Sequence, residues 1–353
     1  MLPYWILYFL TAIPALKTGG YQLGQRMTWG AYFMALLLIL FIGLRYEVGA
    51  DWSPYELMFE DIALMKFSDA LSRTDTAYGF LNWLAHRADA DIWLVNLMCA
   101  AIFVTGLFVF AFKLPNPWLA LAVATPYLVI VVAMGYSRQG VAIGCLMLGL
   151  VAISKHSFAK FLFWLIVATA FHRSALVVLP LVGMAYTRNR VLVFAFGAIA
   201  AVVAYYVFIV SGLEGMIMNY SENEYESQGA AIRAGMNAIP ALLYLANMKR
   251  IPIGESAKKM WRNFSIVAIS SGPLLFVFDS NTVLDRFSLY AIPLQIFVFA
   301  WIPSLYSESA KQNRLIIFLL LAYSAAVQFV WLNFAGHSEF WIPYQIFPQF
   351  LPE

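Results

Sequence analysis

The sequence is a succession of apolar runs, 15 to 22 residues long, separated by short polar breaks. Such runs predict membrane-spanning helices, because about 20 apolar residues cross a hydrocarbon core about 30 Å thick, whereas barrel strands would alternate over about ten residues. Hydrophobic residues make up 62% of the 353 residues and charged residues 12%, far below the roughly 25% charged share of soluble domains. We therefore expect an all-α, polytopic transmembrane helical bundle that forms a single integral membrane domain over residues 1–353.

We expect about twelve spans in this bundle. They cover approximately residues 2–16, 29–44, 92–112, 117–135, 137–154, 158–171, 173–187, 190–211, 233–248, 262–279, 285–303 and 312–333. The first run is followed by Lys17 and has no basic residue before it, the reverse of a cleavable signal peptide. Cys99 and Cys145 both fall inside apolar runs, so we expect neither a disulfide framework nor a zinc site.

The distribution of charge between alternate loops predicts the topology. One set of loops contains fourteen Lys and Arg with two acids, and the other contains eight Lys and Arg with seventeen acids. Because cytoplasmic loops are enriched in basic residues, this asymmetry places both termini outside the cytoplasm. The long run from 158 to 186 is interrupted at His172, and only two short helices that meet there keep this order of loops.

Seven of the eight bases on the predicted outer side are arginine. Four of them, Arg45, Arg138, Arg173 and Arg286, lie at helix ends or in the shortest turns. Ionisable groups at this level are costly unless they have a use, and the planar guanidinium can hold two phosphate oxygens at once. The set therefore favours an anionic ligand. The alternative is that each arginine snorkels or pairs with a neighbour such as Asp285.

Residues 45–91 and 211–232 are the two larger extracytoplasmic loops. In the first, Ser53-Pro54-Tyr55-Glu56 matches a capping box, and the apolar residues after it recur at helical spacing. Those residues are Trp52, Tyr55, Phe59, Ile62 and Met65. We expect an amphipathic surface helix here and a second over Thr76 to Ala88, with Phe80, Trp83 and Leu84 on its apolar side. The acidic 211–232 loop resembles a lid.

Five short motifs then occur in a fixed order along the chain. They are Arg45-x-x-Val48-Gly49-x-Asp51-Trp52-x-x-Tyr55, Ser137-Arg138-Gln139-Gly140-Val141-Ala142, Phe171-His172-Arg173-Ser174-Ala175, Asp285-Arg286-x-x-x-Tyr290 and Pro343-Tyr344. Together with the topology they resemble the EpsG-type, Wzy-like exopolysaccharide polymerases of bacteria. Trp52 is a departure, since members of that family usually have another aromatic residue, often tyrosine, after the aspartate.

The resemblance implies an enzyme that polymerises undecaprenyl-diphosphate-linked oligosaccharide repeat units into exopolysaccharide or O-antigen. The reaction would occur at the outer face of the bacterial plasma membrane. The implied partners are the lipid-linked glycan, membrane lipid, and a chain-length regulator and a flippase of the same pathway; nucleic acid is not among them. No cofactor is expected, and the scattered carboxylates lack the histidine spacing of a metal site.

This chemistry suggests roles for the residues. Stabilising charge on the leaving diphosphate is the main catalytic need, and we assign it to Arg45, Arg138, Arg173 and Arg286. The acceptor hydroxyl needs a general base, for which Asp51 and His172 are the candidates, although His172 could equally serve packing. Tyr55, Gln139 and Tyr290 would orient sugar or phosphate.

Three other functions remain open from the sequence. An O-antigen ligase or another lipid-linked-sugar glycosyltransferase would use the same donor and the same arginines. A non-enzymatic transporter of lipid-linked glycans is disfavoured in its ion-coupled form, because the ionisable residues all fall at or beyond the ends of the expected spans. A structural membrane subunit would not need the outer arginines.

Overall fold

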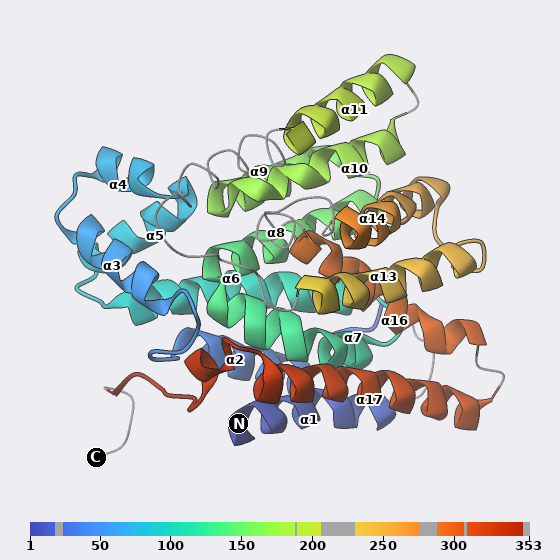
Figure 1. Ribbon diagram of the computed structural model, residues 1–353, viewed down its shortest axis with the longest axis horizontal. Helices are drawn as coiled ribbons and strands as arrows, with labels where there is room; N and C mark the ends of the chain where they lie inside the picture. The colour runs from blue at the N-terminus through green and yellow to red at the C-terminus, as the bar shows by residue number, and fades with distance from the viewer. Residues whose placement is uncertain (18–23, 188, 206–229, 275–287, 307–308, 349–353) are drawn as a thin grey trace. The chain divides into compact units, whose positions relative to one another are not determined.

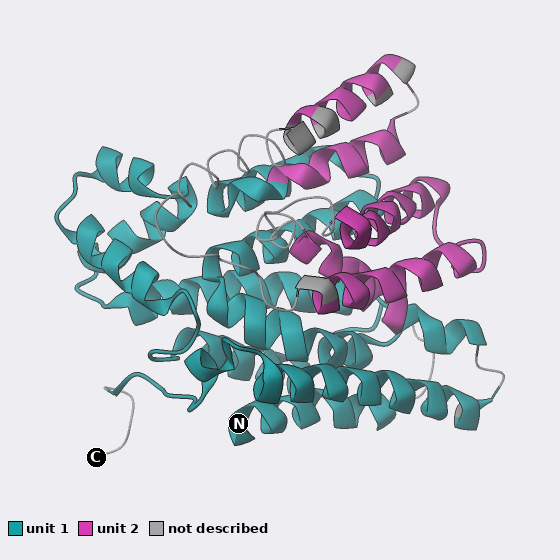
Figure 2. Cartoon of the chain, viewed as in Figure 1, with its two compact units in different colours: residues 1–175, 300–353 teal, residues 176–299 magenta. Residues whose placement is uncertain are grey.

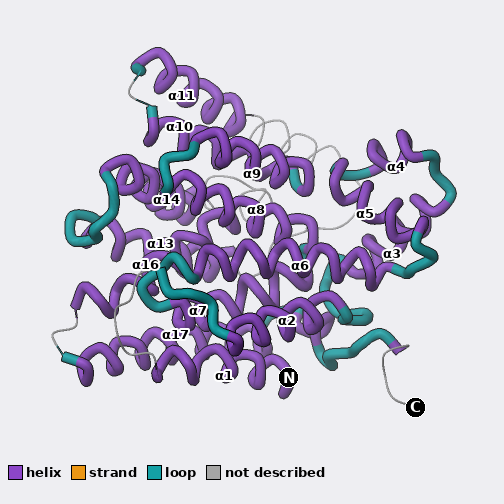
Figure 3. Tube along the Cα trace, turned by 180° about the vertical axis from the view of Figure 1, so that it is seen from behind, coloured by secondary structure: helices purple, strands orange, loops and turns teal. Residues whose placement is uncertain are grey.

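The computed structural model describes residues 1–17, 24–187, 189–205, 230–274, 288–306 and 309–348. Within these ranges the chain is helical and contains no β-strand, only an isolated bridge between Arg45 and Ile346 (Figures 1 and 3). The expected all-α class is therefore confirmed. In the part of the chain that the structure describes, four helical segments are long and apolar enough to cross a membrane: Ile92–Ala111, Ser137–Ser154, Leu289–Tyr306 and Lys311–Phe334.

The chain divides into two compact units, residues 1–175 with 300–353 and residues 176–299 (Figure 2). The first unit contains α1 (Leu2–Lys17), α2 (Trp29–Gly43), α3 (Trp52–Ala63), α4 (Phe67–Arg73), α5 (Thr76–Arg87), α6 (Ile92–Ala111), α7 (Pro117–Ala124), η1 (Thr125–Ala133), α8 (Ser137–Ser154), α9 (Phe158–Phe171), α17 (Ala310–Phe334) and η5 (Ser338–Trp341). The second contains α10 (Val178–Tyr186), α11 (Arg190–Tyr205), α13 (Ala230–Asn247), α14 (Glu255–Leu274) and η4 (Leu289–Ala291). Two elements, η2 (Arg173–Val177) and α16 (Ile292–Tyr306), cross the boundary between them.

Each of the twelve expected spans coincides, within the described residues, with a helix or with two helices in direct succession. Most boundaries agree within a few residues, and the interruption at His172 is present, since α9 ends at Phe171 and η2 begins at Arg173. The largest difference is α14, which begins at Glu255. The sequence interpretation excluded charged residues from spans, whereas this helix continues through its charged first turns.

The 45–91 segment forms three helices instead of the two expected. The first begins at Trp52, with Asp51 at the N-cap, so the capping box predicted at Ser53 is wrong. Its buried residues are Trp52, Tyr55, Phe59 and Ile62, which confirms four of the five residues expected on its apolar face. The fifth, Met65, lies beyond the end of the helix at Ala63 and is half-buried.

In α5, the residues of the expected apolar side are not the ones that the protein buries, so the placement of that side on a membrane surface stays a prediction. Phe80 and Leu84 are exposed, and the helix buries Tyr78, Leu81 and Ala85 instead. The helix packs against α3, α4, α6 and α9.

Glycines set the spacing between α6 and α8, the helix that carries Arg138. A Cβ added to Gly106 would lie 2.1 Å from the carbonyl oxygen of Gly144, and one added to Gly144 would lie 2.7 Å from the Cα of Phe103. The two backbones therefore approach more closely than side chains would allow, as small residues permit between membrane helices. This contact fixes α8 against α6.

The segment after α17 contacts three other elements of the first unit. Trp341 is buried, donates from Nε1 to the Ile130 carbonyl in the π-helix η1, and accepts from the Tyr4 hydroxyl through its carbonyl. Tyr344 stacks on Phe41 and donates to the carbonyl of that residue. The C-terminal segment thus joins α1, α2 and η1.

Candidate functional site

The loop between α2 and α3 is fixed by backbone contacts on two sides. Gly49 has φ +116°, and a Cβ at this position would lie 2.6 Å from the carbonyl oxygen of Met134. Only glycine adopts this conformation without strain. The amide of Gly49 donates to the Phe340 carbonyl at 2.8 Å, and the amide of Tyr46 donates to the Gln345 carbonyl at 3.0 Å. The loop that carries Arg45 is therefore rigidly placed beside the start of α8.

Arg45 connects several elements of this region through hydrogen bonds. Its side chain is buried, with 1% of the residue exposed, and its guanidinium donates four hydrogen bonds to neutral acceptors. These are the carbonyls of Ile42 (2.6 Å) and Val48 (3.1 Å), Oδ1 of Asn96 (3.3 Å) and Oγ of Ser137 (2.7 Å). The residue after Ser137 is Arg138, so Arg45 connects α2, α6 and the first turn of α8.

Arg138 lies at the protein surface of the first unit, with 28% of its side chain exposed. Its Nη1 donates to Oδ2 of Asp75 and to Oγ1 of Thr74, each at 3.0 Å. The guanidinium also lies 5.6 Å from the ring centre of Tyr55 and 6.0 Å from that of Tyr78, within cation–π range. Two residues before α5 and two aromatic rings thus hold this arginine in place.

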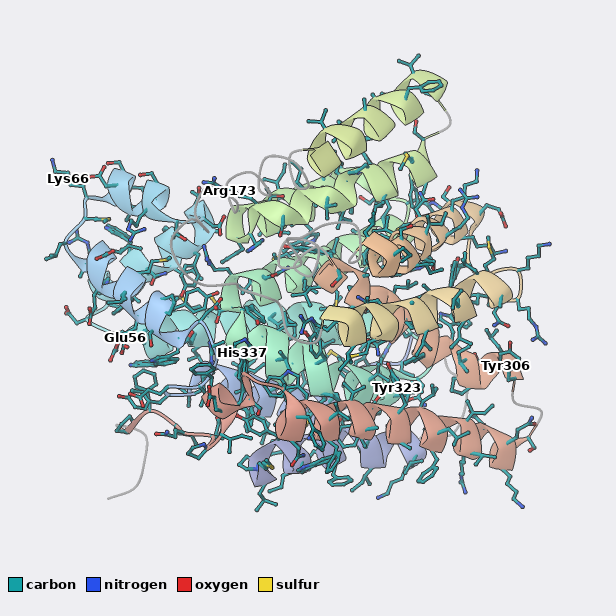
Figure 4. The ribbon with its side chains drawn as sticks, viewed as in Figure 1. Glu56, Lys66, Arg173, Tyr306, Tyr323 and His337 are labelled. Atoms are coloured by element: carbon teal, nitrogen blue, oxygen red, sulfur yellow. The ribbon has the colours of Figure 1, made fainter. Side chains whose placement is uncertain are left out.

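Arg173 belongs to the same group. Its Nε lies 3.8 Å from Oδ1 of Asp75, and 86% of its side chain is exposed. Figure 4 labels Arg173 at the end of α9, on the side of α4 and α5. Asp75 thus presents one carboxylate oxygen to each arginine, and we call Arg138 and Arg173 the arginine pair.

Asp75 itself is nearly buried, with 9% of its side chain exposed. Burial raises the pKa of this carboxyl above its ordinary value, and the two guanidiniums only partly offset that effect. Burial also raises the pKa of Tyr55 to about 12, so the Tyr55 hydroxyl keeps its proton at neutral pH.

The two candidate bases lie in the same unit as the arginine pair. His172 is half-buried, directly precedes Arg173, and shares a hydrogen bond through Nδ1 with the Ser174 hydroxyl. Asp51 is half-buried at the N-cap of α3, and its charge acts on Tyr55, the residue beneath Arg138. Both residues therefore lie beside groups that contact the arginine pair.

The remaining predicted site residues divide into three cases. Gln139 is buried within α8, beside Arg138 in sequence. Tyr290 is buried in η4 of the second unit. Arg286 lies outside the described residues. The structure thus places Arg138 and Arg173 together, puts Arg45 behind them in the protein interior, and leaves the predicted role of Arg286 a prediction.

Asp75 and Thr74 were missed by the sequence interpretation. Asp75 directly precedes the helix expected from Thr76, and an acid at that position is usually a helix cap. In the structure its side chain makes no capping hydrogen bond and faces the two arginines instead. No local pattern in the sequence distinguishes these two uses.

The chemistry available at this site is the binding of an anion with paired oxygens. Two guanidiniums from different helices, one of them highly exposed, can offer several N–H donors to a phosphate or a diphosphate. Among the described residues, no group of three or more His, Cys, Asp and Glu side chains could hold a metal ion.

Comparison with known proteins identifies a family. The family model described as the EpsG family matches residues 29–346, a range that includes the motifs from Arg45 to Tyr344. No curated protein and no solved structure matches the chain. Because the match covers nearly all of the sequence, the protein belongs to the EpsG family, as the order of its motifs predicts.

Proposed function

We propose that this membrane protein polymerises undecaprenyl-diphosphate-linked oligosaccharide repeat units into exopolysaccharide or O-antigen at the outer face of the plasma membrane. The EpsG family is associated with polysaccharide polymerases, and the long apolar helices are those of a membrane protein. The observation that carries the proposal is that Arg138 and Arg173, far apart in sequence, converge on Asp75. Two guanidiniums at one point suit a diphosphate.

In the proposed reaction, a sugar hydroxyl of one chain attacks the anomeric carbon of the repeat unit on another lipid. A new carbon–oxygen bond forms, the bond from that carbon to the diphosphate oxygen breaks, and its electron pair leaves with undecaprenyl diphosphate. Negative charge grows on the diphosphate, and preorganised donors that face this charge lower the barrier. The arginine pair supplies these donors, so the proposed glycosyl transfer is independent of metal.

The proton of the attacking hydroxyl passes to a general base, and Asp51 and His172 remain the two candidates. His172 is favoured by its position beside Arg173 and by its hydrogen bond to Ser174, which fixes the orientation of the ring. When Nδ1 donates to the Ser174 hydroxyl, Nε2 is the basic nitrogen. Normal chain length from Asp51→Asn together with accumulation of single repeat units in His172→Gln would assign this role to His172.

Arg45 takes a different part in this proposal from the one expected from sequence. Its guanidinium is enclosed by protein acceptors, so we assign it to positioning. Through Ser137 it holds the first turn of α8, and with it the side chain of Arg138. The arginines that would contact the diphosphate are then Arg138 and Arg173.

The test supplies purified protein in detergent with lipid-linked repeat units as the only substrate. The wild type should give a ladder of polymer lengths, and Arg138→Lys should give none while its amount and thermal stability stay near normal, because lysine cannot offer a planar fork of donors. Arg73→Lys is the matched control: Arg73 also pairs with an aspartate of the same segment, Asp61, at 2.7 Å, but on the surface. It should leave the ladder unchanged.

The outcomes separate the proposal from the other functions. A ligase would attach repeat units to a different acceptor and give no ladder with these units alone. A transporter would give no new covalent product in either case. A full ladder from Arg138→Lys would remove the arginine pair from the mechanism.

A further inference from the structure

We propose that Asp75 is an exchangeable counter-ion: its carboxylate occupies the arginine pair when the site is empty and is displaced by the diphosphate of the lipid-linked donor. This rests on the proposed function, because it takes the arginine pair as the diphosphate site. Its role would be to weaken the hold on the product, so that undecaprenyl diphosphate leaves after each transfer.

The geometry of the carboxylate is the first argument. Oδ2 of Asp75 faces Arg138 at 3.0 Å and Oδ1 faces Arg173 at 3.8 Å. One anionic group with two oxygens therefore bridges two guanidiniums, which is the arrangement that neighbouring phosphate oxygens would adopt. The carboxylate and the diphosphate would compete for the same donors.

The second argument is that Asp75 alone holds neither α5 nor Arg138 in place. Its side chain makes no capping hydrogen bond to α5, so the helix does not depend on it. Arg138 keeps Thr74 and the rings of Tyr55 and Tyr78 as partners. Arg138 therefore stays in position when the carboxylate moves away.

The third argument is the uneven strength of the two ion pairs. The Arg173 Nε lies 3.8 Å from Oδ1 of Asp75, too far for a hydrogen bond between the two side chains, and 86% of the Arg173 side chain is exposed. The backbone of Arg173 also forms a hydrogen bond with the Asp75 carboxyl, and the Arg173 side chain is not needed for it. Only the arginine of this pair is exposed, since 9% of the Asp75 side chain is exposed, and an exposed guanidinium contributes little through its ion pair because solvent screens its charge. Arg173 can therefore exchange its partner at low cost and bring the incoming diphosphate to Arg138.

The experiment measures inhibition of polymerisation by inorganic pyrophosphate, together with kcat and KM for the lipid-linked donor. Asp75→Asn keeps the shape of the side chain and removes its charge. Pyrophosphate should then inhibit about tenfold more strongly, and both KM and kcat should fall, because donor and product are held more tightly. Asp75→Glu, which keeps the charge, should stay near the wild type.

Asp61→Asn is the control, because it removes the aspartate of the exposed ion pair between Asp61 and Arg73, which lies outside the site. It should change neither the kcat nor the KM for the donor. Asp75→Ser is the second neutral variant, in case the asparagine form does not fold. Loss of stability cannot by itself tighten inhibition, so tightening in either neutral variant supports exchange. Unchanged or weaker inhibition in the neutral variants would overturn it.

The failure of this proposal differs from the failure of the proposed function. If pyrophosphate inhibits the wild type, Arg138→Lys relieves the inhibition, and the neutral variants do not tighten it, only the exchange is refuted. If pyrophosphate does not inhibit the wild type and Arg138→Lys still polymerises, the diphosphate site itself is refuted, and the exchange with it.

Discussion

Replacing Arg45 by lysine tests whether this arginine supports the fold or binds ligand. The guanidinium reaches in two directions: toward the carbonyls of Ile42 and Val48 beside it, and toward Asn96 and Ser137 on α6 and α8. A lysine ammonium is a compact group with three donors. It can satisfy the two near carbonyls but not the two side chains beyond them.

The magnitude follows from those two lost bonds. A hydrogen bond to a charged group contributes about 1.5–3 kcal/mol, so losing two at the lower end costs about 3 kcal/mol. For a folded unit of about 230 residues, each 1 kcal/mol lowers the melting temperature by about 2–4 °C. Arg45→Lys should therefore melt about 6–12 °C below the wild type, although it conserves the charge.

The assay heats purified protein in detergent and measures the fraction that remains monodisperse, alongside binding of pyrophosphate. Arg73→Lys is the control, because that side chain is exposed and surface substitutions change stability by about 0.5 kcal/mol or less. A variant that melts like the wild type but no longer binds pyrophosphate would show that Arg45 contacts the ligand, and the reasoning from its burial would be refuted.

Three further predictions concern Asp75 and two glycines. Since burial raises the pKa of Asp75, its carboxylate should lose its charge as the pH falls from neutral. Inhibition by pyrophosphate should therefore strengthen more steeply with falling pH in the wild type than in Asp75→Asn. Parallel pH profiles of inhibition in the two proteins would contradict this. Gly49→Ala places a Cβ 2.6 Å from the Met134 carbonyl at φ +116°, so it should cost about 1–3 kcal/mol and lower polymer yield, measured by melting and by the ladder assay. Gly106→Ala places a Cβ 2.1 Å from the Gly144 carbonyl and should destabilise by about 1–3 kcal/mol; unchanged melting would mean that α6 and α8 can separate without cost.

The helices could be predicted from sequence because long apolar runs report membrane crossing directly. The break at His172 was predicted because loops rich in basic residues and loops rich in acidic residues alternate along the chain only if two helices meet there. In the structure α9 ends just before this residue and η2 begins just after it. The face of α5 that packs against the protein could not be predicted, because Phe80 and Leu84 are large and apolar but exposed. In a membrane protein, exposed apolar side chains are acceptable, so size and hydrophobicity do not identify the buried face.

The candidate site was predicted in part for a related reason. Arg45, Arg138 and Arg173 give the same signal in sequence, a cation at the end of a span, yet Arg45 is enclosed and Arg173 is 86% exposed. What separates them is the acceptors within reach. Asn96 and Ser137 enclose Arg45 from helices that only the folded chain brings together.

Asp75 gives the clearest case of what the tertiary structure adds. A permanent positive charge attracts any anion, so in the proposed mechanism two adjacent arginines alone would bind the departing lipid diphosphate as well as the arriving one. Tight binding of both adds nothing to turnover, because only interactions stronger in the transition state raise the rate. A carboxylate that competes for the same two guanidiniums lowers their affinity for both lipids. Once the carboxylate is displaced, the two guanidiniums act on the reacting bond with their full charge. The arrangement of Arg138, Asp75 and Arg173 therefore suits the proposed polymerase, which would have to release its product after each of many identical transfers.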